Sequence, residues 1–223
     1  MRQAWWWLGL PVATAAAILI TYRLAPQFYI ERLLPEGYGL LEISHFLFPL
    51  IGFFYCLALL RIPAVKSWPL LKAARIVFAI ACIYIAGEEM SWGQWFFYWN
   101  TPEFWSGINR QQETNLHNTS YFFNQLPQWL LEIAIVVGGL VLPVFTGLRQ
   151  RLKLPILDVL TPSLAIVPVS LMSVAFKTLD RLENHSYFQD ILIKPSEATE
   201  TFFHMFIMFY TIMLYQRLRG ARA

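Results

Sequence analysis

The sequence IVFAIACIYIAGEEMSWGQWFFYW, residues 76–99, decides the fold. It is long enough and apolar enough to cross a bilayer core about 30 Å thick, yet it carries two adjacent acidic residues, Glu88 and Glu89. A carboxylate inside a membrane helix is costly unless it is paired, protonated or bound to a cation. The stretch therefore predicts a membrane helix that carries a functional site toward one end.

The rest of the chain has the same character. Of its 223 residues, 57% are hydrophobic and only 14% are charged, and the mean hydropathy is +0.47. A soluble chain of this composition would expose more apolar surface than water tolerates. No nucleotide-binding fingerprint occurs, and nucleic acid is not an expected partner. We expect one all-α domain, residues 1–223, a polytopic membrane bundle of about six helices at residues 4–22, 40–60, 76–99, 127–146, 159–176 and 198–215.

Basic residues are unevenly distributed between the two sets of helix ends. Eleven of the 17 lysines and arginines fall at residue 2 and within residues 61–75, 149–153 and 217–222. By the positive-inside rule these regions are cytoplasmic, and the loops at residues 23–39, 100–126 and 177–197 face outward. Both termini are then cytoplasmic, and the chain is expected to be an integral membrane protein. All four histidines lie in the outer half, so a polar site is expected to face the periplasm or exterior.

Acidic residues and histidines from several helices reach one depth. At about 1.5 Å per residue, Glu88 lies about 20 Å from Arg75, and His204 lies the same distance from Arg217. Glu42 and His45 are three residues apart, and Glu200 and His204 are four apart, so each pair lies on one helical face. Four-helix carboxylate metal sites use the Glu-x-x-His spacing. The pattern predicts a site for a divalent metal, such as zinc, iron or manganese, with these candidate ligands: Glu42, His45, Glu88, Glu200 and His204.

A simpler interpretation covers part of this pattern. Glu42, Glu132 and Glu197 fall in the first two turns of predicted helices, where a negative charge complements the helix dipole and lies within reach of water. A histidine at a helix end is commonly an interfacial residue. Glu88 and Glu89 are harder to explain in this way, because they approach the C-terminal end of their helix, where the dipole disfavours them, unless the helix breaks at a nearby glycine.

Four residues are candidates for catalysis. Glu88 and Glu89 are two of them, and the other two, Glu113 and His117, are four residues apart in the outer loop. They share one face only if this part of the loop is helical.

Residues 87–118 resemble a bacterial family of small multi-pass membrane proteins. The resemblance rests on GEEMSWGQ at residues 87–94 and on NRQQETNLHN at residues 109–118, where the family carries GEEISWGQ and N-x-Q-x-E-x-N-L-H-N. This chain has Met90 in place of isoleucine, and it has Tyr38 and Gly39 where the family has Gly and Pro in the first loop. The resemblance implies a bacterial cytoplasmic membrane and a site in this region, and it carries no established activity.

Three functions are compatible with the sequence. The first is a membrane-embedded, metal-dependent hydrolase that acts at the outer leaflet on a lipid, a lipid-linked sugar or a membrane peptide. The second is a binding or transport protein whose carboxylates carry protons or cations, although no inverted repeat is present. The third is an accessory subunit that docks a partner membrane protein.

Overall fold

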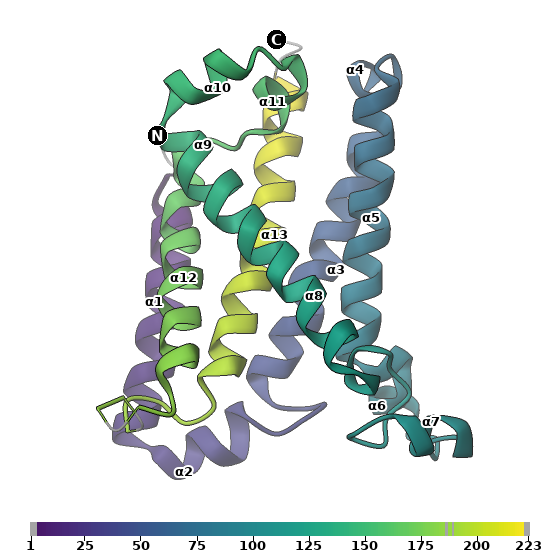
Figure 1. Ribbon diagram of the computed structural model, residues 1–223, viewed down its shortest axis with the longest axis vertical. Coiled ribbons are helices and arrows are strands. Elements are labelled where there is room, and N and C mark those ends of the chain that lie inside the picture. Colours follow the sequence, from purple (N-terminus) through teal and green to yellow (C-terminus); the bar gives the residue numbers. More distant parts are fainter. Residues whose placement is uncertain (1–3, 186, 189, 221–223) are drawn as a thin grey trace.

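The computed structural model describes residues 4–185, 187–188 and 190–220, and within these residues the chain is helical, without strands. Figure 1 shows long helices that run side by side and short helices at both ends. The long ones are α1 (Ala4–Leu24), α3 (Leu40–Leu60), α5 (Pro69–Glu89), the continuous run α8 (Tyr121–Ile133), η4 (Ala134–Val141) and α9 (Leu142–Val144), then α12 (Val167–Leu182) and α13 (Pro195–Gly220). The short ones are α2 (Pro26–Phe28), η1 (Tyr29–Leu33), α4 (Pro63–Lys66), η2 (Ser91–Gly93), α6 (Gln94–Phe97), α7 (Glu103–Ile108), η3 (His117–Thr119), α10 (Thr146–Leu152), α11 (Pro155–Leu160) and η5 (Leu164–Ile166).

Helix α13 is the centre of the bundle. It packs against α3 and against α12, and its side chains from Ala198 to Leu214 are largely buried on every face. In Figure 1, α1 and α12 lie to one side of α13, α3 and α5 lie to the other, and α8 crosses in front. A helix that is enclosed on all sides can carry polar residues, provided that neighbouring helices satisfy them. This position explains why a helix of moderate hydropathy holds two of the candidate site residues.

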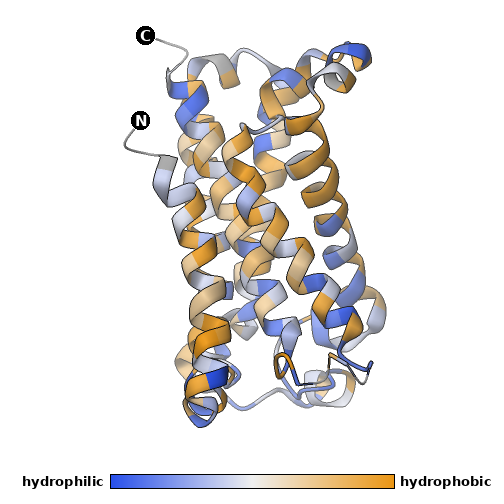
Figure 2. Ribbon diagram, turned by 90° about the vertical axis from the view of Figure 1, so that its left-hand side faces the viewer, coloured by the Kyte–Doolittle hydropathy of each residue, from blue (hydrophilic) through white to orange (hydrophobic). Residues whose placement is uncertain are grey.

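Four of the described helical segments are long enough and apolar enough to cross a membrane: Trp5–Leu24, Leu40–Leu60, Pro69–Glu89 and Tyr121–Val144. Helices α12 and α13 run beside them in the same bundle. Large apolar side chains such as Leu8, Phe54 and Val77 are exposed on the outside of the bundle. Figure 2 shows apolar residues along the helices, with hydrophilic ones gathered toward the two ends. The all-α membrane bundle expected from the sequence is confirmed.

Two of the predicted helices are broken in the structure. The stretch 76–99 is not one helix: α5 ends at Glu89, because Ser91, Trp92 and Gly93 have left-handed backbone angles, with φ of 46°, 56° and 104°. The stretch 159–176 is likewise interrupted between Leu160 and Leu164. The segment between them contains Pro162, which cannot donate a helix hydrogen bond.

Helix α3 has the predicted bounds, whereas α8 and α13 begin earlier than predicted, for identifiable reasons. Helix α8 begins at Tyr121 because the Ser120 hydroxyl caps it, accepting a hydrogen bond from the Phe123 backbone nitrogen at 3.3 Å. Helix α13 begins at Pro195, a residue that favours the first turn of a helix. Figure 1 shows the start of α1 and the end of α13 at the same end of the bundle.

Candidate metal centre

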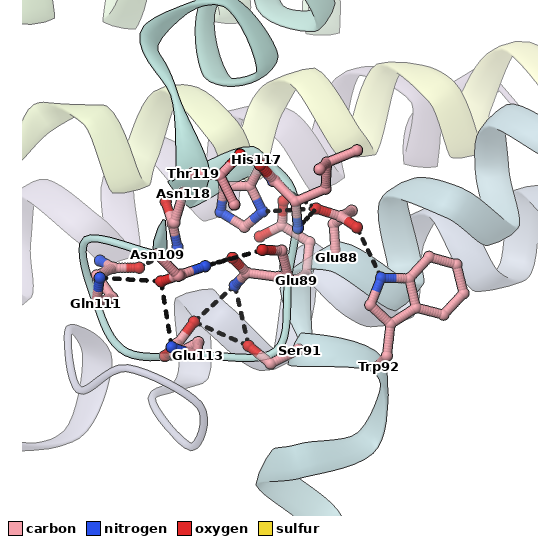
Figure 3. Close-up of polar contacts among 12 residues, drawn as sticks. Glu88, Glu89, Ser91, Trp92, Asn109, Gln111, Glu113, His117, Asn118 and Thr119 are labelled. Atoms are coloured by element: carbon pink, nitrogen blue, oxygen red, sulfur yellow. Dashed lines mark hydrogen bonds and ion pairs between the residues drawn. The ribbon is translucent and has the colours of Figure 1, made fainter. Parts of the chain in front are cut away.

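Helix α5 presents two carboxylates in its last turn. Successive residues of an α-helix point about 100° apart, since a turn takes 3.6 residues, so Glu88 and Glu89 cannot share one set of partners. Glu89 points into the bundle toward α3 and α13, where its carboxylate lies near two histidines. Glu88 turns toward the loop that follows α5 (Figure 3).

Glu89, His45 and His204 form a compact group of metal-ligand atoms. One Glu89 oxygen lies 3.6 Å from Nδ1 of His45, and the other lies 4.0 Å from Nε2 of His204. Both histidines are buried. Their ring centroids are 5.5 Å apart. Ligand atoms around a tetrahedral zinc ion, bonded at about 2.0–2.2 Å, lie about 3.4 Å from one another. The ligand atoms of the group lie within 4.8 Å of one another, so they would have to move closer together to hold a metal ion.

Hydrogen bonds fix the orientation and the tautomer of His45. Its Nε2 atom lies 2.9 Å from the backbone oxygen of Glu197 and 2.9 Å from the Thr201 hydroxyl oxygen. The Thr201 hydroxyl donates its own proton to the same Glu197 oxygen, at 2.9 Å. Both atoms facing Nε2 are thus acceptors, so Nε2 carries the proton and Nδ1 carries a lone pair. That lone pair is buried without a hydrogen-bond partner in the described part of the chain and faces the Glu89 carboxylate.

Glu200 is the fourth group beside this centre. One of its oxygens lies 3.9 Å from Nδ1 of His45, and the other accepts a hydrogen bond from the Gln128 amide at 3.0 Å. Lys177 donates to the Gln128 oxygen at 3.3 Å and to the Asp180 carboxylate at 2.8 Å. Gln128 therefore links α8 to the centre and holds Glu200 in place.

A second group of three ligand atoms adjoins the first. Glu42, His45 and Glu197 also present ligand atoms within 4.8 Å of one another. This group shares His45 with the first, and the Nε2 atom of His45 is already engaged by backbone and hydroxyl oxygens. The lone pair of Nδ1 faces Glu89 and Glu200 instead, so the first group is the better-built site.

Glu88 anchors the loop at residues 109–119. One of its oxygens accepts a hydrogen bond from the Trp92 indole at 2.6 Å. The other accepts from the backbone nitrogens of Leu116 at 2.7 Å and His117 at 2.6 Å, and it lies 3.3 Å from Nδ1 of His117 (Figure 3). Gly87 makes room for this arrangement, because a Cβ atom there would lie 2.8 Å from the Trp92 ring. These donors stabilise the negative charge of Glu88, which the helix dipole disfavours at the C-terminal end of α5.

Glu113 belongs to a separate network within the same loop. Its carboxylate accepts hydrogen bonds from the Ser91 hydroxyl at 2.8 Å and from the Asn115 amide at 2.7 Å. Asn109 closes the loop by donating to the backbone and side-chain oxygens of Asn115, at 2.8 and 2.7 Å. The loop is non-helical from Asn109 to Leu116, so Glu113 and His117 do not share a helical face. Their predicted pairing required a helix in this part of the loop, and the loop is not helical there.

Two cavities meet at this layer. A polar cavity of about 310 Å³ opens among the loops, and an apolar cleft of about 730 Å³ lies between α5, α8–η4 and α13. Among the described residues, both are lined by Glu89, His117, Asn124, Gln128 and Glu200. The centre is therefore accessible both from a polar space and from an apolar one.

The structure places most of the candidate residues predicted from the sequence in one layer, but they do not all face the same site. His45, His204 and Glu200 lie beside Glu89, Glu42 lies beside Glu197, and Glu88 faces away from both groups. Sequence reasoning did not single out Thr201 and Gln128, which orient His45 and Glu200. Thr201 lies four residues after Glu197 and three before His204, so helical spacing alone could have indicated it.

Comparisons of this chain with protein-family models, with curated proteins and with solved structures find no match. The resemblance seen in residues 87–118 therefore stays a prediction, and function has to be argued from the geometry of the site.

Proposed function

We propose that this protein is a membrane-embedded, metal-dependent hydrolase that acts on a lipid-type substrate. The observation that carries the proposal is the buried lone pair of His45, which no donor satisfies among the described residues and which faces the Glu89 carboxylate. A lone pair and a carboxylate that face each other without a proton donor repel, and a divalent cation between them removes the repulsion. Histidine ligands of metals commonly donate their other ring N–H to a backbone carbonyl, as His45 does here.

The ligand set fits a catalytic metal better than a structural one. Two histidines and one carboxylate leave a fourth position open in a tetrahedral site, which is the arrangement of many zinc hydrolases. A divalent metal in such a site makes bound water a nucleophile at neutral pH. Glu200 is the nearest further carboxylate, and we assign it the role of general base.

A proton donor for the leaving group is available where the two cavities meet. His117 lines both cavities, and its Nδ1 atom lies 3.3 Å from the Glu88 carboxylate. A carboxylate beside one ring nitrogen holds an imidazole in a fixed orientation. We assign His117 as general acid and Glu88 as the residue that positions it. Glu113 has no part in this proposal, because its carboxylate is engaged by Ser91 and Asn115.

The location of the site also favours a substrate that resides in the membrane. The cleft beside Glu89 is lined largely by apolar side chains and lies against α5, one of the helices suited to cross a bilayer. A site in the outer half of the membrane, as the basic residues predict, would meet lipids, lipid-linked sugars or membrane peptides. Coupled ion transport is less well supported, since beyond the centre the cleft offers apolar walls and no chain of charged groups among the described residues.

Metal content of the purified protein tests the proposal. We expect elemental mass spectrometry to find stoichiometric metal in the wild type in detergent, and to find it lost in Glu89→Gln and in His204→Ala. His185→Ala is the matched control, because this histidine lies exposed in the loop before α13. A wild type that binds no zinc, iron or manganese after their addition would exclude the metal-dependent mechanism.

A further inference from the structure

The apolar cleft extends along most of the bundle. One end of its wall contains Glu89 and His204, and the other contains Leu157 and Leu160 of α11, a helix that lies at the opposite end of the bundle from α6 and α7 (Figure 1). Its volume of about 730 Å³ falls within the range of roughly 300–1,000 Å³ that is common for ligand sites. An apolar space that starts at the candidate centre and extends to α11 fits a hydrocarbon chain.

Glycine keeps part of this cleft open. Gly138 lies on its wall in η4, and a Cβ atom built there would meet no other atom within 4 Å. Gly9 in α1 is equally unhindered, but it lies outside the cleft and is exposed on the surface of the bundle. The two glycines therefore allow a matched test. A large side chain at position 138 would fill the cleft, whereas one at position 9 would lie on the outer surface of the bundle.

Acidic side chains predominate on the wall of the polar cavity. Seven carboxylates line it among the described residues, including Glu36, Asp180 and Glu200, against a single lysine, Lys177. Lys177 is already paired with Asp180 at 2.8 Å. A bound divalent cation together with Lys177 would supply only three positive charges beside these seven acidic groups. A phosphate or sulfate group would be repelled from this cavity, whereas a hydroxyl, amide or amine would find acceptors.

The two cavities join where the candidate centre lies. A molecule with its apolar chain in the cleft and its polar part in the polar cavity has the bond between these two parts beside Glu89 and Glu200. His117 lines both cavities at the same junction. The junction, and not a bond within the head group or within the chain, is thus the position exposed to attack.

From this arrangement we infer that the substrate is an acyl lipid whose head group carries no phosphate, being either uncharged or an amine, and whose ester or amide carbonyl lies at the junction. The inference rests on the proposed hydrolase function. In the reaction, the hydroxyl of water bonds to the carbonyl carbon, and the C–O or C–N bond to the head group breaks. The remaining proton goes to the departing alcohol or amine, so the products are a fatty acid and the free head group.

Photo-crosslinking with two matched lipids tests the inference. The probes are a monoacylglycerol and a lysophosphatidic acid that carry the same diazirine-labelled acyl chain and differ only in the phosphate. We expect the monoacylglycerol to label peptides from residues 78–85 and 130–138, with roughly tenfold or greater preference over the phosphate-bearing probe. Gly138→Phe should abolish this labelling, and Gly9→Phe should leave it unchanged.

Charge removal at the rim of the polar cavity separates electrostatic selection from chain binding. The double variant Glu36→Gln and Asp180→Asn removes two carboxylates that the proposal does not use as metal ligands. We expect it to reduce the preference for the uncharged probe while the monoacylglycerol still labels the cleft. An unchanged preference would contradict selection by the polar cavity.

Labelling of metal-stripped protein distinguishes this inference from the proposed function. Equal labelling by the two probes, or labelling spread over α1 as well as the cleft, overturns the inference whatever the metal content. Selective labelling of a protein that never binds metal upholds the lipid site and overturns the hydrolase. Hydrolysis of the lysophosphatidic acid at a rate equal to that of the monoacylglycerol would refute the head-group selection while leaving the hydrolase intact.

Discussion

Glu88 and Glu89 are adjacent in sequence, yet their surroundings are opposite. Glu88 accepts hydrogen bonds from one indole and two backbone nitrogens, so its charge is fully solvated by the protein. Glu89 faces two buried histidines and accepts no hydrogen bond among the described residues. A carboxylate of the first kind stabilises a fold, whereas a carboxylate of the second kind is maintained at a cost and indicates a ligand. We therefore assign a structural role to Glu88 and a ligand-binding role to Glu89.

The largest effect on stability is expected for Glu88→Gln. The amide has a single acceptor oxygen, so at least one of the donors from Trp92, Leu116 and His117 is left without a partner. Bonds to a charged acceptor contribute about 1.5–3 kcal/mol each, so we expect the free energy of unfolding to fall by roughly 3 kcal/mol or more. Thermal unfolding in detergent measures this.

Glu89→Gln is the matched control for that variant. It should lose the metal and keep a thermal stability close to that of wild-type protein stripped of metal. If both variants lost stability equally while retaining metal, the division of roles between the two carboxylates would be wrong.

Thr201→Val should weaken the metal centre without unfolding the protein. The valine keeps the volume of the side chain but removes the hydroxyl that contacts Nε2 of His45, leaving only the Glu197 carbonyl to orient the ring. Loss of such an outer-shell partner typically lowers metal affinity by about 10–100-fold. Competition with a chelator of known affinity, at equal protein stability, gives the measurement, and unchanged affinity would show that Thr201 does not orient the ligand.

Acidification should release the metal before it disrupts the loop around Glu88. Histidine and carboxylate ligands bind a metal only when deprotonated, so protons compete with it, and affinity rises with pH and falls as pH decreases. We expect metal content to decrease as the pH is lowered, while the protein is still folded. Metal content that does not fall at any pH at which the protein stays folded would argue against these ligands.

The sequence was sufficient to predict which polar residues lie at the same depth, but not which residues they contact. Counting residues from the arginines at the opposite helix ends placed His45, His204 and Glu88 at similar depth, because the rise of an α-helix is fixed. It could not distinguish Glu88 from Glu89, since that depends on how α5 is rotated about its axis and on where the helix ends. The break at Ser91 and Trp92 was not predictable from composition, because both residues are non-glycine yet adopt left-handed angles.

The loop at residues 109–119 shows a second limit of sequence reasoning. A spacing of four between Glu113 and His117 has meaning only within a helix, and Asn109 and Asn115 instead close a non-helical loop by bonding to each other. Asparagine favours such turns because its side chain imitates backbone groups. The shared-face interpretation failed because two asparagines compete with helix formation in this segment.

The smallest effect on stability is expected for substitution of Glu132, which serves as a reference for Glu88 and Glu89. It pairs with Arg181 at 2.7 Å, but the Arg181 side chain is 56% exposed, so water and ions can replace the partner. We expect Glu132→Gln to change the free energy of unfolding by no more than about 1 kcal/mol, and to leave metal content unchanged. Thermal unfolding and elemental mass spectrometry on the same sample measure both quantities. A loss as large as that of Glu88→Gln would mean that burial and the number of donors do not decide what a carboxylate in this layer contributes.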